Sequence, residues 1–252
     1  MPAAVAEKIN YVLLPSAGSK TISLRVNRDC TVTVRAPGHV SRDDVAEFVA
    51  KRAGWILEKQ RYFKGLSQVY PPKEFKNGES FDFLGRKLRL KLFRSAGRRS
   101  TECEVAERRL KLFLAGQTGR ELKAAASSAI RELYSRHTAL RARAFVRKHA
   151  ASLAIKPGRI LIVDPKKRWG SCARNGDVRL NWRISMMPPA VIEYVIVHEL
   201  CHLKVHSHSP KFWSILKSIL PDYENRRAWL RRHGPAVLLV SEWGGENRGS
   251  ED

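Results

Sequence analysis

The chain lacks any long uninterrupted run of apolar residues, and none approaches the roughly 18 residues that a membrane-spanning helix needs. The apolar N-terminal stretch is broken by Glu7, Lys8 and Pro15, which is not typical of an export signal. Only four cysteines are present, and no two of them form a CxxC pair, which favours free thiols over a disulfide framework. We therefore expect a cytoplasmic protein that does not bind membranes.

Acidic residues are also scarce, since 24 Asp and Glu stand against 47 Lys and Arg and give a formal net charge of +23. Such an excess makes a nucleic acid a candidate partner. No basic block is interleaved with aromatic stacking residues, so a solvated basic surface is the simpler interpretation and nucleic acid is a secondary hypothesis. The hydrophobic content of 43% in 252 residues is ample for a packed core and predicts a folded globular protein.

The first half of the chain is predicted to be mainly β-structure with one helix. Residues 21–36 alternate apolar and polar side chains on both sides of a polar turn, which predicts a β-hairpin. Ser41 begins a pattern typical of a capped helix, which we expect to end before Pro71. Short strand-like segments follow at 80–93 and 108–115.

The pattern changes near residue 119, and the second half is predicted to be mainly helical. Residues 120–154 have few helix breakers and predict a long helix with a basic face. A strand at 159–164 and an Asn175-Gly176 hairpin turn indicate a small second sheet. Three further helices are expected to begin near Pro189, near Pro210 and after Pro221. The residues that we assign to the basic face are Arg131, Arg136, Arg141, Arg143, Arg147 and Lys148.

Residues 198–208 hold four histidines and one glutamate, at the end of an apolar run that predicts a buried helix. On a helix His198 and His202 are one turn apart, so both imidazoles project from one face and can bind one ion. A catalytic zinc site needs a third protein ligand and leaves a fourth position for water. Because the chain can leave the helix after His202 before Pro210 starts another, His208 can turn back toward the ion. We therefore predict His198, His202 and His208 as ligands of Zn2+.

Glu199 completes an HExxH pattern and is the predicted general base. In such helices the carboxylate reaches the metal-bound water instead of the metal. Zinc lowers the pKa of that water to about 7, so Glu199 can take its proton and later pass it to a leaving amine. Chance predicts roughly 0.016 HExxH matches in a chain of this composition. The pattern therefore indicates metal-dependent hydrolysis of peptide bonds.

Two other residues are alternatives for the third ligand. His206 could share the helix face if the helix continued, although three ligands in one row would give poor tetrahedral geometry. Glu224 is a distant carboxylate of the kind that some zinc proteases use. A different interpretation treats the histidines as hydrogen-bonded core residues, but burying a glutamate and two histidines on an apolar helix is costly unless something satisfies them.

Several motifs occur in a fixed order along the second half of the chain: RWGSC at 168–172, LNW at 180–182, PPAVIEYVIVHELCHL at 188–203, HSPKFW at 208–213 and LPDY at 220–223. Together they resemble the YgjP-like metallopeptidase family, which is itself similar to the SprT-like zinc proteases. The resemblance extends from about residue 20 to about residue 235. One departure is Ser207, where members often have Asn.

The resemblance implies zinc-dependent peptidase chemistry, with His198, His202 and His208 at the ligand positions and Glu199 at the catalytic one. The histidine spacing is also similar to that of the metzincins. That family has glycine where this chain has Val205, and the chain shows no convincing Met-turn, so we reject the metzincin interpretation.

These patterns together predict an α+β protein. We expect an N-terminal β-rich region with one helix at 1–118, a zincin-like metallopeptidase domain with a small sheet and the HExxH helix at 119–243, and a flexible tail at 244–252. In zinc proteases of this shape the strand before the metal helix can pair with an extended substrate. We therefore expect residues 177–185 to form a wall of the cleft.

The side chains around the predicted site are expected to be mostly structural. Arg168 and Trp169 could bind substrate or fasten the RWGSC segment under the metal helix, and fastening is the preferred interpretation. Phe212 and Trp213 would belong to the core. Tyr194 and Tyr223 could each donate to a tetrahedral oxyanion, but a structural hydroxyl is the preferred interpretation of both.

The leading functional hypothesis is a zinc metallopeptidase that acts on protein or peptide substrates. The alternative is a DNA-associated zinc protein, either a protease that acts on nucleic-acid-bound proteins or a binding module with structural zinc. A metal-dependent hydrolase of a non-peptide amide is a third hypothesis.

Overall fold

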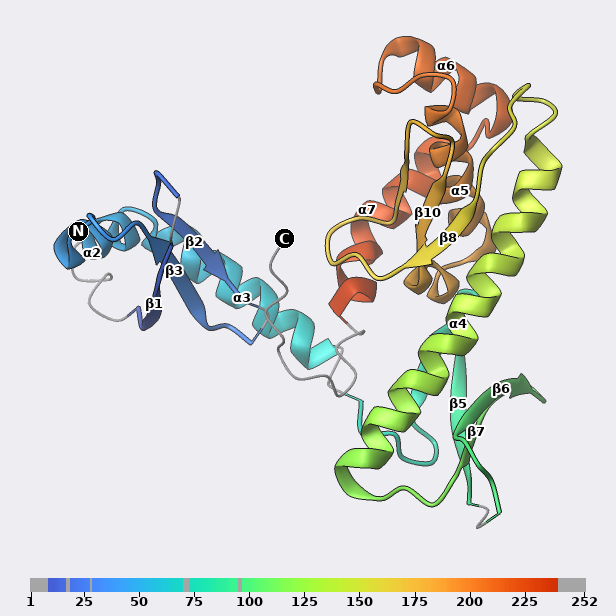
Figure 1. Cartoon of the computed structure of the whole chain (residues 1–252), viewed down its shortest axis with the longest axis horizontal. Helices are drawn as coiled ribbons and strands as arrows, with labels where there is room; N and C mark the ends of the chain where they lie inside the picture. Colours follow the sequence, from blue (N-terminus) through green and yellow to red (C-terminus); the bar gives the residue numbers. More distant parts are fainter. Residues whose placement is uncertain (1–8, 17–18, 28, 70–72, 95–96, 240–252) are drawn as a thin grey trace. The chain divides into compact units, whose positions relative to one another are not determined.

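The computed structural model describes residues 9–16, 19–27, 29–69, 73–94 and 97–239 (Figure 1). The tail expected at 244–252 lies outside these residues. The described chain contains six α-helices and three small mixed sheets, which confirms the predicted α+β class. It divides into two compact units, residues 1–71 and 72–252, which we describe separately. This division does not coincide with the change of pattern near residue 119.

Unit 1 contains a three-stranded sheet and two helices. Strands β2 (Ser23–Val26) and β3 (Val32–Ala36) form the predicted hairpin, and β1 (Tyr11–Pro15) pairs in parallel with the outer side of β3. The alternation predicts β2 and β3 but not β1, whose apolar side chains are mostly exposed. Buried side chains of β3 pack with those of the helices to form a separate small core.

The single helix expected after Ser41 is two helices in the structure. Ser41 caps α2 (Arg42–Ala50) as predicted, because its hydroxyl accepts from the backbone N–H of Asp44 at 3.0 Å. A tight turn at Lys51 and Arg52 then separates α2 from α3 (Ala53–Val69). The apolar spacing continues through this turn, so the sequence pattern does not reveal the break.

Unit 2 begins with a four-stranded sheet in the order β4-β5-β7-β6. One face of the sheet packs against the N-terminal half of the long helix α4, through a core that includes Leu90, Leu110, Ile130 and Tyr134. The bounds of these elements are β4 (Ser80–Phe83), β5 (Arg86–Arg94), β6 (Glu102–Ala106), β7 (Arg109–Leu114) and α4 (Gly119–His149).

The C-terminal half of α4 contacts the elements that carry the histidines, so this helix joins both parts of unit 2 (Figure 1). This part of unit 2 consists of β8 (Ile160–Val163), β9 (Gly170–Cys172), β10 (Val178–Asn181), the 3-10 helix η1 (Trp182–Met186), α5 (Pro189–His202), α6 (Pro210–Ile219) and α7 (Tyr223–Leu239), and α4 contacts its β8, η1 and α5. The strand, the hairpin at Asn175-Gly176 and the three helices predicted here are confirmed.

The basic residues assigned to one face of α4 do not share a face. Arg136, Arg143 and Arg147 are exposed and lie within about 40° of one another around the helix axis. Arg131 instead lies 3.9 Å from a carboxylate oxygen of Asp164, and Lys148 forms an ion pair across to α5. The basic face is therefore a stripe of three arginines.

The small second sheet corrects the prediction for residues 177–185. Strand β10 is the central strand of the order β8-β10-β9, so both of its edges are paired. After Asn181 the chain turns into η1, because the Asn181 side chain accepts a hydrogen bond from the backbone N–H of Arg183. Strand β9 lies beside α5, and among the described residues it pairs with β10 alone, so its other edge is unpaired there.

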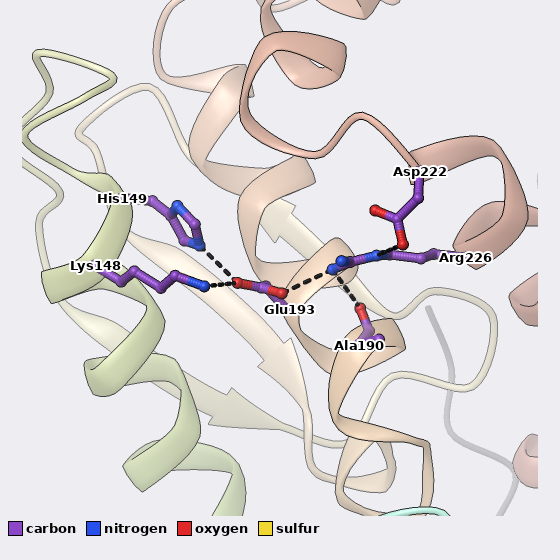
Figure 2. A network of polar contacts seen from close by, with 6 residues as sticks. All are labelled: Lys148, His149, Ala190, Glu193, Asp222 and Arg226. Atoms are coloured by element: carbon purple, nitrogen blue, oxygen red, sulfur yellow. Dashed lines mark hydrogen bonds and ion pairs between the residues drawn. The ribbon is translucent and has the colours of Figure 1, made fainter.

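A network of charges fixes helix α5 between α4 and α7 (Figure 2). The carboxylate of Glu193 accepts hydrogen bonds from Lys148 and His149 of α4, each at 2.8 Å, and from Arg226 of α7 at 2.7 Å. Arg226 also donates to Asp222 at 2.9 Å. Burial raises the pKa of Glu193, but these three donors outweigh it and lower the pKa to about 2. Glu193 is therefore ionised and well paired five residues before His198.

All four cysteines are free in the structure, as predicted. Among the described residues, no helix combines the length and the apolar character needed to cross a bilayer.

Candidate metal centre

Helix α5 carries the first two histidines of the candidate site. Pro189 opens the helix at its first turn, and His202 is its last residue. His198 and His202 project from the same face with their ring centroids 4.9 Å apart. The helix ends there because the backbone N–H groups of Lys204 and Val205 both turn back to the carbonyl of Cys201, each at 3.0 Å.

His208 returns toward this face from the loop between α5 and α6. Its Nε2 lies 3.0 Å from Nε2 of His198, and one ligand nitrogen from each of the three histidines lies within 4.8 Å of the others. Nδ1 of His202 donates to the carbonyl of Val205 at 3.1 Å, since a carbonyl oxygen can only accept. This bond leaves the Nε2 lone pair of His202 available to a ligand.

The cluster fits a zinc ion by the chemistry and the spacing of its donors. Two nitrogens bound tetrahedrally at roughly 2.0–2.1 Å from one zinc ion lie about 3.3 Å apart. The separation of 3.0 Å between His198 and His208 is close to this value. Burial, together with the neighbouring His202 and His208, lowers the pKa of His198 to about 3. Burial also lowers the pKa of His202, which favours the neutral imidazole, the form that binds metals.

Glu199 follows His198 on α5, and its side chain lies against strand β9. Only 7% of the residue is exposed, and burial raises the pKa of its carboxyl to about 7, against the lowering effect of Arg168. Its side chain lies against Gly170, where a Cβ atom would be 2.7 Å from Oε1 and 2.7 Å from Cγ. Only glycine leaves room for the carboxylate at this place. A glycine inside a short strand was the sequence signal for such a close approach.

Phe212 forms the apolar floor of the cluster. It is fully buried, as predicted, and its ring centroid lies 4.9 Å from those of His198 and His208 and 4.6 Å from that of His202. A dry wall on one side of the imidazoles excludes water and strengthens the electrostatic interactions of the site.

Trp213 packs against the core as a partly buried residue and lies beside His208. Its indole Nε1 donates to the backbone carbonyl of His208 at 3.0 Å, and the two rings stack with centroids 5.6 Å apart. The third histidine comes from a loop and is exposed, so this contact fixes both its backbone and its ring. Sequence reasoning gave Trp213 no role in the site.

The two alternative ligands lie outside the cluster formed by the described residues. His206 is exposed on the loop before His208. Glu224 is exposed at the start of α7, where it accepts a hydrogen bond from the Tyr223 hydroxyl at 3.2 Å. The structure therefore brings together His198, His202 and His208, and their binding of a metal ion stays a prediction.

Two tyrosines line the region next to the histidines. The ring centroids of Tyr194 and His198 lie 5.8 Å apart. Burial raises the pKa of the Tyr194 hydroxyl to about 12. Tyr223 stacks on Trp213 at 5.6 Å and donates to Glu224. The hydroxyl of Tyr223 thus has the structural partner that was expected of it.

The segment before β9 is held by the sheet and by α7. The buried side chain of Asn181 donates to the carbonyl of Arg168 at 3.0 Å, and its backbone N–H donates to the carbonyl of Trp169 at 2.8 Å. The Trp169 ring lies against Gly234 of α7, where a Cβ would be 3.0 Å from the indole. Trp169 therefore fastens this segment, whereas the side chain of Arg168 is exposed.

Comparison with known proteins adds a family assignment to this geometry. A family model described as the YgjP-like metallopeptidase domain matches residues 20–233, a range that contains all three histidines and Glu199. The crystal structure of the metallopeptidase zymogen abylysin of Pyrococcus abyssi is 19% identical and matches with a TM-score of 0.34, over 37% of this chain and 93% of that one. A comparison with curated proteins found no match.

Proposed function

Because the chain belongs to the YgjP-like metallopeptidase family, we propose that it is a zinc-dependent peptidase in which Glu199 activates the attacking water. The observation that carries this proposal is the approach of three imidazoles from two different segments, with the buried Glu199 next to His198 on α5 and its side chain against Gly170. Three nitrogen ligands with an open fourth position are typical of catalytic zinc, whereas structural zinc sites are closed by four protein ligands.

The chemistry follows from the positions of these groups. A zinc ion held by His198, His202 and His208 would supply a Lewis acid for the scissile carbonyl and the water. Glu199 takes a proton from the attacking water at its carboxylate oxygen and later gives it to the leaving amine nitrogen. A C–O bond forms and the C–N bond breaks. A carboxyl with a pKa of about 7 can both accept and release a proton near neutral pH.

Strand β9 offers an edge for an extended peptide. The backbone groups of Trp169 and Ala173 bond to the β10 side, which in an alternating antiparallel ladder turns those of Gly170 and Cys172 outward. These outward groups lie beside Glu199, since Gly170 contacts its side chain. A substrate that pairs with β9 would therefore run past the general base.

The test replaces the base and the ligands separately. Glu199→Gln should retain one zinc ion per chain and lower the rate of casein digestion about 10²- to 10⁴-fold, because only the proton transfer is removed. His198→Ala should lose both metal and activity. His206→Ala and Glu224→Ala are matched controls that should retain both. Undiminished hydrolysis by the Glu199→Gln protein would contradict the mechanism, and loss of zinc from only the Glu224→Ala protein would contradict the ligand assignment.

A second candidate function is association with nucleic acid, which the arginine stripe on α4 favours. Arg136, Arg143 and Arg147 are exposed on one side of the helix and could follow a phosphate backbone. Binding to duplex DNA should then weaken steeply as salt is added, because counterions are released. Replacing Arg143 and Arg147 with Gln should make the plot of log K against log salt concentration less steep, by the amount that corresponds to about two phosphate contacts. No binding at low salt would remove this candidate.

A further inference from the structure

Two arginines next to the histidine cluster have no carboxylate partner among the described residues. Arg168 stands before β9, Arg227 lies on α7, and both side chains are exposed. The neighbouring Arg226, by contrast, is paired with both Asp222 and Glu193. Cations that the protein itself leaves without an anionic partner, beside the place where a scissile bond must lie, are available to a substrate.

Arg168 is presented by a fixed backbone. Its carbonyl accepts from the fully buried side chain of Asn181 at 3.0 Å. Two residues later, Gly170 lies in contact with the side chain of Glu199. The positive charge of Arg168 acts on the Glu199 carboxyl, so it lies within electrostatic range of the general base. An acidic group bound by Arg168 would therefore lie close to the base on the β9 side.

Arg227 is held near His208, another ligand of the same cluster, through two stacked aromatic rings. Its guanidinium carbon lies 4.6 Å from the ring centroid of Trp213, and that ring stacks on His208. Arg227 also acts electrostatically on Tyr194, on Tyr223 and on His198. Among the described residues the Arg227 guanidinium makes no hydrogen bond or ion pair, so its N–H groups can form paired hydrogen bonds with a carboxylate.

We propose that Arg168 and Arg227 make the enzyme selective for peptides that carry acidic side chains close to the scissile bond, one reaching toward the start of β9 and one toward α7. The inference rests on the proposed peptidase function and adds its substrate class. An acidic peptide is favoured over nucleic acid because both arginines adjoin the base and a ligand of the metal centre, whereas the exposed arginine stripe of α4 belongs to another element. One charge-assisted hydrogen bond corresponds to a preference of about tenfold or more.

The experiment uses the full-length, zinc-loaded protein. Casein digestion first identifies one cleaved sequence, and a peptide of that sequence is made with Glu or with Gln at the positions flanking the scissile bond. The value of kcat/KM is measured for both peptides at low and at high salt. The variants are Arg168→Gln and Arg227→Gln, and the control is Arg174→Gln, which removes an exposed arginine from the β9–β10 hairpin.

The wild-type protein should prefer the Glu peptide about tenfold or more at low salt, and the preference should shrink at high salt. Arg168→Gln and Arg227→Gln should each bring the ratio of the two kcat/KM values toward one, whereas Arg174→Gln should keep the wild-type ratio. Equal cleavage of the two peptides by the wild-type protein would overturn the inference while leaving the peptidase function intact. A preference that survives in both arginine variants would overturn the assignment to these residues.

A binding measurement separates this inference from the peptidase function. If no peptide is cleaved, the peptidase proposal fails, but binding of the Glu and Gln peptides to the Glu199→Gln protein can still be compared by fluorescence anisotropy. Tighter binding of the Glu peptide that depends on Arg168 and Arg227 supports the acidic ligand class, and equal binding overturns it. If short duplex DNA binds at these two arginines more tightly than the Glu peptide, they form a nucleic-acid site and the inference is overturned.

Discussion

The contact between Gly170 and Glu199 gives a sharp test of how the base is positioned. Gly170→Ala would place a Cβ atom 2.7 Å from Oε1 and 2.8 Å from Cδ of Glu199. Ordinary contacts between carbon and oxygen are about 3.3–3.6 Å. The carboxylate must therefore move by about 0.6–0.9 Å, because the new methyl group sits on a backbone that is fixed in the sheet.

The size of the effect follows from this displacement. A misplacement of about 1 Å can reduce a rate 10²-fold, so we expect kcat to fall about 10- to 100-fold. None of the nearest atoms to the new Cβ belongs to a histidine, so zinc stoichiometry should stay unchanged. Overpacking of this kind costs about 1–3 kcal/mol of unfolding free energy, which lowers Tm by several degrees.

The assay combines casein digestion, zinc analysis and thermal unfolding in a double-mutant cycle. In a Glu199→Ala background the clashing atoms Cγ, Cδ and Oε1 are absent, so the further change of Gly170→Ala should cost much less stability than it does in the wild type. Gly97→Ala is a control in the same unit, since nothing lies within 4 Å of its added Cβ. Full activity of the Gly170→Ala protein, or the same loss of Tm in both backgrounds, would refute the positioning role.

Three further predictions concern the supports of the site. Trp213→Phe keeps a stacking ring but removes the indole hydrogen bond to the carbonyl of His208. Zinc affinity, measured by chelator competition, should therefore fall about tenfold or more, whereas Trp229→Phe should keep the wild-type zinc affinity. The pKa of Glu193 is lowered from 4.5 to about 2, so its contribution to stability is present above pH 5 and is lost as the pH falls from about 4.5 toward 2. Because one donor is largely solvent-exposed, this contribution should be about 1–2 kcal/mol, and acid unfolding of the Glu193→Gln protein should lack it. Gly85 has a positive φ of 75°, and a Cβ added there would lie 2.9 Å from Pro188, just before α5. In urea unfolding, Gly85→Ala should therefore lower the free energy of unfolding by about 1–3 kcal/mol more than Gly78→Ala does. Gly78 is the control because it has a positive φ but no atom within 4 Å of the added Cβ.

Much of the candidate site could be predicted because its signals are local. His198 and His202 share a face through helical periodicity alone, and the structure places them so. The end of α5 and the restart of the chain at Pro210 follow from nearby helix signals, and together they let His208 return. The hairpin at Asn175-Gly176 likewise depends on its own turn residues.

Other features could not be predicted because they depend on which segments become neighbours. The sequence of β10 resembles that of any buried strand, and only the order β8-β10-β9 shows that its edges are occupied and that β9 lies at the edge. Helical spacing continues across the break between α2 and α3, where a backbone turn redirects the chain. In the same way, the change of pattern near residue 119 does not reveal that the apolar face of α4 packs against the preceding strands.

Local patterns were enough to predict the helix that carries His198 and His202, the loop position of His208 and the place of Glu199 next to His198, since these residues lie within a few turns of one another along the chain. The packing of distant segments was needed to show that Gly170 accommodates Glu199, that Trp213 fixes His208, and that Arg168 and Arg227 have no carboxylate partner among the residues that the structure describes. Periodicity and turn chemistry act over a few residues, whereas close contacts and unmatched charges arise when distant segments pack together.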